Sequence, residues 1–350
     1  MVGDVAPDSE APLVAIAMAT FNPAQELLER QVESLRTQTH QHWVCVLSDD
    51  ASEPSSIDGA ERIVGADERF RVLRSTTRRG VYRNFERALA NIPSDAGFIA
   101  FSDQDDVWHP DKLTTLLTAI RRADAMLAYS DMNIVSPDGT LIASSYWSDR
   151  RNNYRDLGSL LLVNTVSGAA LLFRRELLAD ALPFPPEVGR PFHDHWMACV
   201  ALGLGEIVYV DRPLVDYVQH GGNVVGRHEP SAGDFRGGLV HAMRRFVSNP
   251  RLRFRNTVTR ASGCYADELI PRQFLARTLE ERLAGRLVAD KRRAVRRIAR
   301  MESSPRSLLW LLARSARDVR GESATLGIEN QLVKGVLWHW QEAVRRRVLR

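Results

Sequence analysis

The sequence has few cysteines and no pattern that would use them. Its three cysteines, Cys45, Cys199 and Cys264, are odd in number and far apart in a chain of 350 residues. This spacing predicts neither a disulfide framework nor a zinc site, and it is typical of proteins in a reducing cytosol. The chain also lacks a Gly-x-x-x-x-Gly-Lys loop. That absence excludes the P-loop kinases but leaves other phosphate chemistry open.

Long apolar runs and targeting segments are missing as well. No stretch approaches the ~18 apolar residues that a membrane-spanning helix needs. Residues 1–11 are expected to be a flexible acidic N-terminus without the apolar centre of a signal peptide. We find no internal repeat and no low-complexity tract. The length fits two domains, or one large domain with an appendage, and we expect the protein in the cytoplasm.

Charge is distributed unevenly along the chain, whose formal net charge is +4. Residues 1–230 hold 21 Lys and Arg against 32 Asp and Glu, a net charge of −11, whereas residues 231–350 hold 26 against 11, a net charge of +15. The basic region predicts a polyanionic partner. Leucines at helical spacing, with Trp338 and Trp340, favour the cytoplasmic face of an anionic membrane. The alternative is a helical subdomain with a solvated basic face. An acidic body would repel nucleic acid, so none is expected.

Apolar runs of strand length recur across residues 12–230, with helical patterns between them. Strands are predicted at 13–20, 43–48, 70–74, 97–101, 126–131, 164–173, 206–210 and 213–217. Helices are predicted at 24–37, 81–90 and 193–203, and Pro137-Asp138-Gly139 predicts a hairpin turn. Because strand and helix alternate, the early strands should pair in parallel, which predicts an α/β domain.

An acidic cluster directly follows the strand at 97–101. Asp103, Asp105 and Asp106 place three carboxylates within four positions. Like charges this close repel one another unless a cation lies between them, and Mg²⁺ commonly binds one or two carboxylates together with substrate phosphates. Open α/β sheets bind ligands at the carboxyl ends of their strands. The cluster therefore predicts a metal–diphosphate site, and the alternative is a solvated acidic turn that caps the next helix.

Two further polar loops are expected at the same sheet edge. Asp49 and Asp50 follow the strand at 43–48, where one of them could accept a hydrogen bond from a nucleoside base or ribose. The alternative is a helix cap formed with Ser52. Arg79 and Gly80 precede a helix, which is a plausible anion contact.

Three positions later in the chain are also candidates. Asp194 opens a helix between two histidines and beside Trp196, where it could act as a general base or merely cap the helix. His220 lies in a polar Gly-rich loop, where it could contact a metal or phosphate or simply form a hydrogen bond. Gly168 indicates either close backbone approach to a ligand or tight packing.

In their order, these motifs resemble the family 2 inverting glycosyltransferases, which use the GT-A nucleotide-diphospho-sugar transferase fold. The resemblance covers about residues 12–226 and rests on Val14 to Asn22, Ser48 to Ser52, Arg79-Gly80 with Asn84-Phe85, Ser102 to Leu113, Ser167-Gly168, His193 to Trp196 and Tyr217 to Asn223. The last two motifs look most like bacterial rhamnosyltransferase-like members that build cell-surface polysaccharides. The resemblance implies a mixed, mostly parallel sheet flanked by helices in residues 12–230, followed by a basic helical region at 231–350.

The resemblance also implies roles for matching residues. Asp194 would be the catalytic base. Donor-nucleotide binding would involve Thr20, Asp50, Arg79 and Asp103. A divalent metal, Mg²⁺ or Mn²⁺, would be held by Asp103 and Asp105, with His220 nearby. The acceptor and sugar pocket would involve Trp108, Gly168, His193, His195 and Trp196. The family often has Arg two positions before the loop histidine. Here that residue is Val218, so Arg79 or Arg227 would have to replace its phosphate contact.

The expected activity is inverting transfer of a sugar from a nucleotide-diphosphate donor, such as dTDP-rhamnose, to a hydroxyl of a cell-surface glycan or lipid-linked acceptor. A single displacement with a metal and a carboxylate base would carry it out. Two alternatives remain open. One is a metal-dependent nucleotidyl- or phosphotransferase, which also needs clustered carboxylates. The other is a polyanion-binding protein that acts through residues 231–350.

Overall fold

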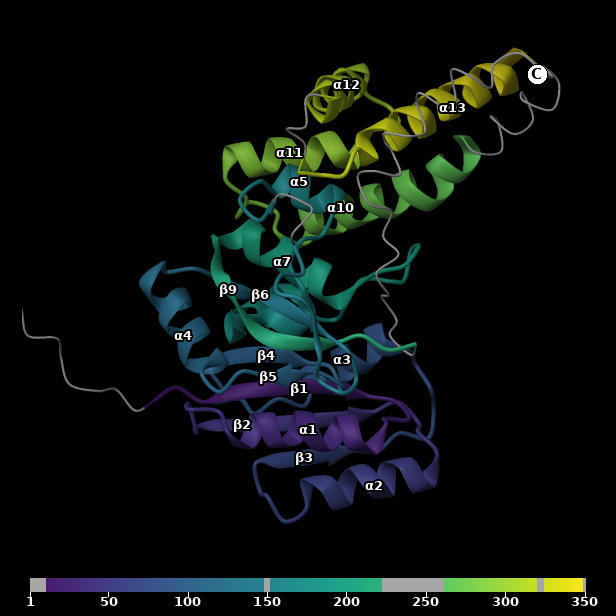
Figure 1. Ribbon diagram of the computed structural model, residues 1–350. Coiled ribbons are helices and arrows are strands. Elements are labelled where there is room, and N and C mark those ends of the chain that lie inside the picture. Colours follow the sequence, from purple (N-terminus) through teal and green to yellow (C-terminus); the bar gives the residue numbers. More distant parts are fainter. Residues whose placement is uncertain (1–10, 148–151, 222–260, 320–323, 349–350) are drawn as a thin grey trace, which may run out of the picture. The chain divides into compact units, whose positions relative to one another are not determined.

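A computed structural model describes residues 11–147, 152–221, 261–319 and 324–348 (Figure 1). These residues form two compact units. The first is drawn from residues 1–146, 167–184 and 206–220, and the second from residues 147–166, 185–205 and 221–350. Residues 147–166, 185–205 and 221–230, which lie within 12–230, therefore belong to the second unit, and the end of the catalytic domain at residue 230 stays a prediction. The predicted N-terminal segment 1–11 lies outside the described residues except for Ala11.

The described part of the first unit is built on a nine-stranded mixed sheet with the order β3-β2-β1-β4-β8-β6-β9-β5, and β7 pairs with β6. Its strands are β1 (Val14–Thr20), β2 (Trp43–Asp49), β3 (Phe70–Leu73), β4 (Phe98–Ser102), β5 (Val107–Trp108), β6 (Leu127–Val135), β7 (Leu141–Ala143), β8 (Leu171–Arg174) and β9 (Ile207–Val218). Strands β1 to β4 are mutually parallel, as the alternation of strands and helices predicts. Strands β5, β7 and β8 run antiparallel to their neighbours.

Helices pack on both faces of this sheet. On one face lie α1 (Gln25–Arg36), α2 (Pro54–Val64) and α4 (Lys112–Arg122). They share a buried core with β1 and β2, in which Leu28 and Leu116 pack with Ile16. The other face carries α3 (Val81–Leu89), whose Phe85 ring lies 5.0 Å from that of Phe101. The short helix α6 (Leu178–Ala181) follows β8.

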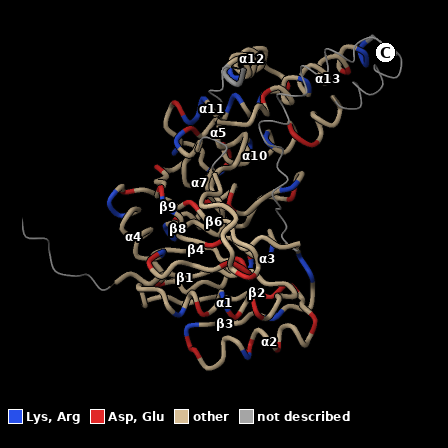
Figure 2. Tube along the Cα trace, in the orientation of Figure 1, with Lys and Arg blue, Asp and Glu red and all other residues tan. Residues whose placement is uncertain are grey.

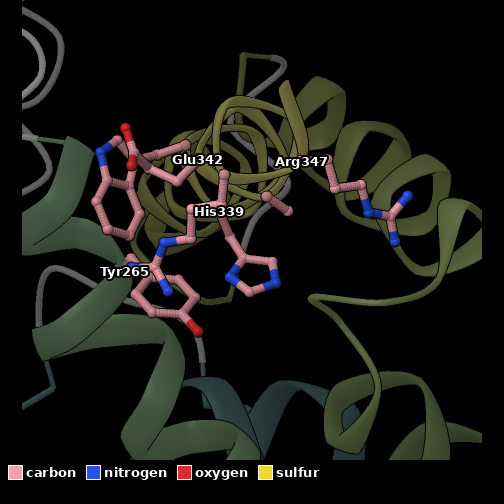
Figure 3. A pocket seen from close by; sticks show the side chains of 7 residues that line it. Tyr265, His339, Glu342 and Arg347 are labelled. Carbon is pink, nitrogen blue, oxygen red and sulfur yellow. The ribbon is translucent and has the colours of Figure 1, made fainter. Parts of the chain in front are cut away.

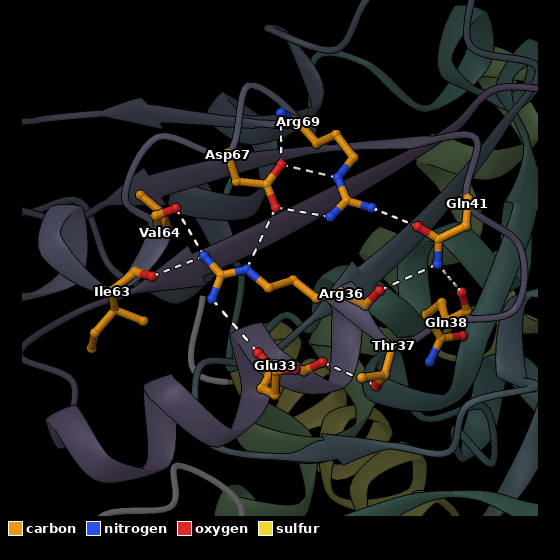
Figure 4. Close-up of polar contacts among 9 residues, drawn as sticks. All are labelled: Glu33, Arg36, Thr37, Gln38, Gln41, Ile63, Val64, Asp67 and Arg69. Atoms are coloured by element: carbon orange, nitrogen blue, oxygen red, sulfur yellow. Dashed lines mark hydrogen bonds and ion pairs between the residues drawn. The ribbon is translucent and has the colours of Figure 1, made fainter.

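The amino-terminal ends of the strands are tied together by a polar network (Figure 4). Arg36, at the end of α1, donates to the Ile63 and Val64 carbonyls of α2 at 3.0 and 2.9 Å. Arg36 and Arg69 both contact the Asp67 carboxylate, at 3.4 and 2.8 Å. The hydrogen bond from Arg69 lowers the pKa of Asp67 to about 2. This end of the sheet is therefore fixed by internal contacts.

The second unit is helical in its described residues. It contains α5 (Leu157–Leu162), α7 (His193–Leu204), a π-helical turn η3 (Cys264–Leu269), α10 (Ile270–Arg282), α11 (Ala289–Ala299), α12 (Pro305–Val319) and α13 (Ile328–Val348). Leu160, Leu279 and Val295 are fully buried within it. Lys and Arg recur along α11 and at the C-terminal end of α13 (Figure 2). No helix in the described ranges is both long enough and apolar enough to span a bilayer.

Most of the predicted elements are confirmed, with three differences. The predicted strand at 164–173 is wrong in its first half, because residues 168–170 form a 3-10 turn and β8 begins at Leu171. The predicted strands at 206–210 and 213–217 form the single strand β9, which has register irregularities opposite Pro213. Proline cannot donate to a sheet ladder, so an irregular register accommodates it. Helices α2, α5 and α6 and the short strand β5 were not predicted.

Candidate active site

Three loops leave the sheet at one edge. Parallel pairing aligns Thr20 of β1 with Asp49 of β2, and Met18 of β1 with Ser102 of β4. The segments that follow β1, β2 and β4 therefore start side by side at the carboxyl ends of these strands. Open α/β sheets bind ligands at this edge. Thr20, Asp50 and Asp103 all belong to it, the region where the sequence predicts a donor site.

Backbone strain is concentrated in these loops. Asn22 after β1 and Ala51 after β2 have φ angles of 42° and 63°, which non-glycine residues rarely adopt. Reciprocal hydrogen bonds hold them, since Asn22 N donates to Ser52 Oγ at 2.8 Å and Glu53 N donates to Asn22 Oδ1 at 2.8 Å. Strained backbone that its surroundings fix is concentrated at functional sites. We therefore regard this edge as pre-shaped for a ligand.

Asp50 supports the loop that precedes α3. Its Oδ1 accepts a hydrogen bond from Arg79 N at 2.7 Å, and its Oδ2 accepts one from Gly80 N at 2.8 Å. The side chain is only 3% exposed. Asp49 Oδ2 accepts from Ser52 N at 3.1 Å, but the N-cap of α2 is Glu53, so the capping alternative fits neither aspartate. Contact between Asp50 and a nucleoside stays a prediction, and such a contact would add to these two bonds.

A buried amide links β1, β2 and α3. Asn84 Nδ2 donates to the Ser48 carbonyl at 2.7 Å and to the Thr20 carbonyl at 3.3 Å. Ser48 Oγ donates to Asn84 Oδ1 at 2.7 Å. The sequence motif contains Asn84, but sequence reasoning gave it no role. An amide on the apolar side of a predicted helix is the signal that could have identified it, since buried polar groups require partners.

A cavity of about 610 Å³ lies beside α3, lined by Arg79, Arg83, Glu86, Arg87, Ala90, Leu182 and Pro183. Two of its three guanidinium groups are engaged by the protein. Arg83 contacts Glu86 at 2.7 Å, and Arg87 donates to the Leu73 and Asp49 carbonyls at 3.1 Å. Arg79 is exposed and pairs with no carboxylate in the described part of the chain. It is the guanidinium that remains available to an anion. The other predicted contact, Arg227, lies outside the described residues.

The three carboxylates of the acidic cluster differ in environment. Asp103 and Asp105 are half-buried, whereas Asp106 is fully buried. Asp106 Oδ1 accepts from Val218 N at 3.2 Å. Burial, and then the charges of Asp103 and Asp105, hold the pKa of Asp106 well above its usual range. The helix-capping alternative does not apply, because the N-cap of α4 is Asp111.

A buried lysine lies behind this cluster. The Lys112 ammonium donates to the Ala169 carbonyl at 2.5 Å and lies 3.2 Å from the centre of the Trp108 ring. Trp108 is 2% exposed, so it packs in the core, and its predicted role in a sugar pocket stays a prediction. Gly168 is buried in the 3-10 turn just before Ala169.

His220 meets the acidic cluster through Asp105. His220 Nε2 lies 2.8 Å from Asp105 Oδ2, so strand β9 brings these two predicted metal-site residues together. Within the described ranges, no group of three or more His, Cys, Asp or Glu side chains is arranged to hold a metal ion. Two carboxylates and one imidazole still form a donor set suited to Mg²⁺ or Mn²⁺, because such ions complete their coordination with water and substrate phosphates.

Asp194 and its neighbours belong to the second unit. Phe192 is the N-cap of α7, so Asp194 lies in the first helical turn and does not cap the helix. Its Oδ1 accepts from His195 N at 2.6 Å. Burial lowers the pKa of His193 to about 3 and that of His195 to about 4, and His195 Nε2 lies 2.7 Å from the Leu160 carbonyl. Trp196 is 1% exposed. Whether these residues line a sugar pocket stays a prediction.

Comparison with known proteins bears on the family and the fold. The family model "Glycosyl transferase family 2" matches residues 15–182. TuaG of Bacillus subtilis (strain 168), named as a teichuronic acid biosynthesis glycosyltransferase, is 27% identical over 157 residues, which are 45% of this chain and 60% of that protein. RfbG of Shigella flexneri, named as a dTDP-rhamnosyl transferase, is 25% identical over 223 residues, which are 60% of this chain and 73% of that protein.

A solved structure extends the comparison to the fold. S. aureus TarS 1–349, crystallised in complex with UDP, has a TM-score of 0.52 and 15% sequence identity. The match covers 95% of this chain and 91% of that one. At this identity the likeness concerns the fold alone. The mixed sheet, the loops at its carboxyl edge, the family match and this structural likeness lead to one conclusion: residues 15–182 are a glycosyltransferase family 2 domain, in a chain that has the GT-A fold.

Proposed function

We propose that this protein is an inverting glycosyltransferase that moves a sugar from a nucleotide-diphosphate donor to an acceptor hydroxyl. The observation that carries the proposal is the sheet edge where the loops after β1, β2 and β4 begin side by side. The nucleoside would bind against Thr20 and the loop that Asp50 supports. Arg79 would face the diphosphate, because its side chain is exposed and has no carboxylate partner in the described residues.

A divalent cation, Mg²⁺ or Mn²⁺, would be held by Asp103 and Asp105, with His220 as their neighbour. When bound, such a cation neutralises negative charge on the diphosphate. The protein residues have separate tasks around it. His220 lies 2.8 Å from Asp105 and orients that carboxylate. Asp106 is fully buried behind the cluster, where its Oδ1 accepts a hydrogen bond from Val218 N at 3.2 Å. Lys112 supports the loop from within the core.

Asp194 would act as the general base that takes the proton from the acceptor hydroxyl. Its half-buried carboxylate lies in the first turn of α7, where the helix dipole favours the negative form that a base requires. The hydrogen bond from His195 N at 2.6 Å fixes the position of one carboxylate oxygen. Direct displacement with such a base inverts the configuration at the anomeric carbon.

For the donor we propose a deoxysugar nucleotide such as dTDP-rhamnose, since RfbG is named as a dTDP-rhamnosyl transferase. The acceptor would be a cell-surface glycan or a lipid-linked precursor. WfgD of Escherichia coli, 24% identical over 174 residues, is named for an acceptor that carries diphosphoundecaprenol. We further propose that the protein is peripheral at the cytoplasmic face of the plasma membrane. The net charge of +15 over residues 231–350 supports this attachment.

The proposal is tested with purified protein and a panel of nucleotide sugars (dTDP-rhamnose, UDP-glucose, UDP-galactose and GDP-mannose) in Mg²⁺, Mn²⁺ or EDTA. Thermal shift and release of nucleoside diphosphate are measured. One donor should stabilise the protein in a metal-dependent manner, by about 2.7 kcal/mol at 100 times its dissociation constant. Release of pyrophosphate, or transfer of phosphate in place of sugar, would identify a nucleotidyl- or phosphotransferase and refute the proposal.

Two variants test the proposed roles, with Asp95→Asn as the control at an exposed aspartate. Asp194→Asn should lower the transfer rate by about 10²–10⁴-fold while donor binding is retained. Asp105→Ala should weaken metal-dependent donor binding. Near-normal turnover in the first variant, or an unchanged metal response in the second, would remove that residue from the mechanism.

A further inference from the structure

A second cavity lies in the helical unit, and the donor chemistry does not use it. It has a volume of about 360 Å³ and lies between η3 and α13 (Figure 3). It is lined by Tyr265, Trp338, His339, Glu342, Ala343, Arg346 and Arg347. Three aromatic rings and two arginines thus surround one space, all within the second unit. Aromatic walls with a few convergent polar groups are typical of ligand sites.

The aromatic wall is held in place by several contacts. The Tyr265 ring is stacked on His339, with centroids 5.0 Å apart and an angle of 11° between the planes. Trp338 lies 5.2 Å from the same ring. The Tyr265 hydroxyl donates to Glu302 at 3.0 Å, and Glu302 also pairs with Arg277 at 2.8 Å. The rings therefore form a pre-organised surface.

A glycine allows the two sides of the cavity to approach. A Cβ on Gly335 of α13 would lie 3.1 Å from backbone atoms of Cys264 and Tyr265. Only glycine therefore fits this approach without a shift of the backbone. Tyr265 itself lies on the π-helical turn, and π-helical turns are frequent at functional sites. The close contact of α13 with η3 determines the shape of the cavity.

The charge on the cavity favours an anion. Arg346 and Arg347 are exposed, and neither pairs with a carboxylate in the described part of the chain. Arg345 is different, because it lies 3.6 Å from Glu342. Arginines in the last turn also interact favourably with the helix dipole, but that effect does not require an aromatic wall beside them. Guanidinium groups bind phosphate oxygens in a planar, bidentate manner.

Exposed apolar side chains lie on the same helices. On α13, Leu337 is 49% exposed and Val344 is 61% exposed, and their spacing of seven residues places them on one side of the helix. On α12, Leu309 is 66% exposed. Apolar side chains beside arginines on a surface helix are the pattern of helices that lie in the membrane interface. Leu337 and Val344 lie on the side of α13 opposite Arg346, so they do not line the cavity and bear only on how the helix meets a membrane surface.

We propose that the cavity between η3 and α13 binds the phosphate-bearing headgroup of an anionic membrane lipid. Arg346 and Arg347 contact the phosphate, and the aromatic wall packs against the polyol next to it. This inference rests on the proposed membrane attachment of the second unit and is independent of the donor chemistry.

The test compares two variants of the full-length protein that lose the same charge. Arg346→Gln/Arg347→Gln alters the cavity. Arg293→Gln/Arg297→Gln removes two exposed arginines from α11, which have no carboxylate partner among the described residues. Binding is measured by co-sedimentation with vesicles of phosphatidylcholine alone or mixed with phosphatidylglycerol. The cavity variant should lose about 30-fold in affinity for the anionic vesicles, as expected for two arginines at a membrane surface. The control should lose much less.

A third variant keeps the charge of the arginines and alters only the wall. His339→Gln should reduce the preference for anionic vesicles while the protein stays folded by circular dichroism. Equal losses in the two arginine variants would overturn the cavity as the site, since general electrostatics would then explain binding. Absence of wild-type binding to anionic vesicles would also overturn it. So would stabilisation by inorganic phosphate without vesicle binding, which would assign the cavity to soluble phosphates. Donor hydrolysis by the wild type is also measured without vesicles. If the protein hydrolyses the donor but does not bind anionic vesicles, the lipid site is refuted while the proposed glycosyltransferase function stands.

Discussion

The loop before α3 depends on Asp50, and the Asp50→Asn substitution tests this dependence. In the wild type, both carboxylate oxygens accept backbone hydrogen bonds, at 2.7 Å from Arg79 N and 2.8 Å from Gly80 N. Asparagine has nearly the same shape but only one acceptor. Its NH₂ group would face one of the two amides, so that one bond is lost and a buried donor remains unsatisfied. The remaining bond becomes neutral and weaker.

The expected loss follows from these two bonds. Hydrogen bonds to charged groups contribute about 1.5–3 kcal/mol each, and a neutral bond contributes about half as much. With one bond lost and one weakened, the free energy of unfolding should fall by about 3 kcal/mol. In a domain of 150–250 residues, 1 kcal/mol changes Tm by about 2–4 °C. We therefore expect Tm to fall by about 6–12 °C.

Thermal unfolding and hydrogen exchange together measure the effect. The amides of Arg79 and Gly80 should exchange slowly in the wild type and much faster in the Asp50→Asn variant. Asp95→Asn, at an exposed site, is the control and should change neither quantity. Unchanged Tm and unchanged exchange in the Asp50→Asn variant, together with lost donor binding, would refute the reasoning. The carboxylate would then act on the ligand and not on the loop.

Three further predictions concern stability. The pKa values of His193 and His195, about 3 and about 4 in the folded protein, lie below the ~6.5 of an unfolded chain, so the folded state binds fewer protons and loses stability as pH falls below about 6.5. Each of the two histidines should lower the free energy of unfolding by about 2 kcal/mol at pH 5. If either histidine is replaced by Gln, the urea midpoint of the variant should depend less on pH than that of the wild type. Gly203→Ala should destabilise the protein by about 1–3 kcal/mol in the same assay, because the new Cβ would lie 2.5 Å from Leu283 Cδ1. Asn84→Ala should cost about 1–3 kcal/mol, because it removes three buried hydrogen bonds, one of them the bond that Asn84 Oδ1 accepts from Ser48 Oγ, and a urea midpoint equal to that of the wild type would contradict this.

The sequence predicts the first half of the sheet well for a simple reason. Apolar runs such as residues 13–20 can only be buried strands, and helices between them force parallel pairing. The carboxyl edge with its acidic loops follows from that topology. Helix α2 was missed because Pro54, Ser55 and Ser56 favour turns. Its Gly59 also disfavours a helix in the sequence, and only the structure explains this glycine, because the Gln25 side chain occupies the space where a Cβ would lie.

The details of the site could not be predicted from local sequence. Asp50 bonds to amides 29 and 30 residues away, and His220 meets Asp105 across 115 residues. Such partners are set by the tertiary fold and leave no periodic signal. The irregular register opposite Pro213 joined two predicted strands into one for the same reason. The position of Asp194 in the second unit was hidden as well, because nothing in the local sequence separates residues 185–205 from the rest of the predicted domain.

The interleaving of the two units has a consequence for how such a protein can be altered. The chain leaves the first unit at residue 147, returns at 167, leaves again at 185 and returns at 206 before the C-terminal helices begin. Helices α5 and α7, and with them Asp194, are part of the same compact unit as α10 and α11. The C-terminal helices therefore do not form a separate domain by themselves, because they share a compact unit with residues 147–166 and 185–205. A recombinant or evolutionary exchange with a single boundary at residue 230 would transfer only part of the second unit and would leave its hydrophobic core incomplete. An exchange that also includes residues 147–166 and 185–205 would transfer the whole unit.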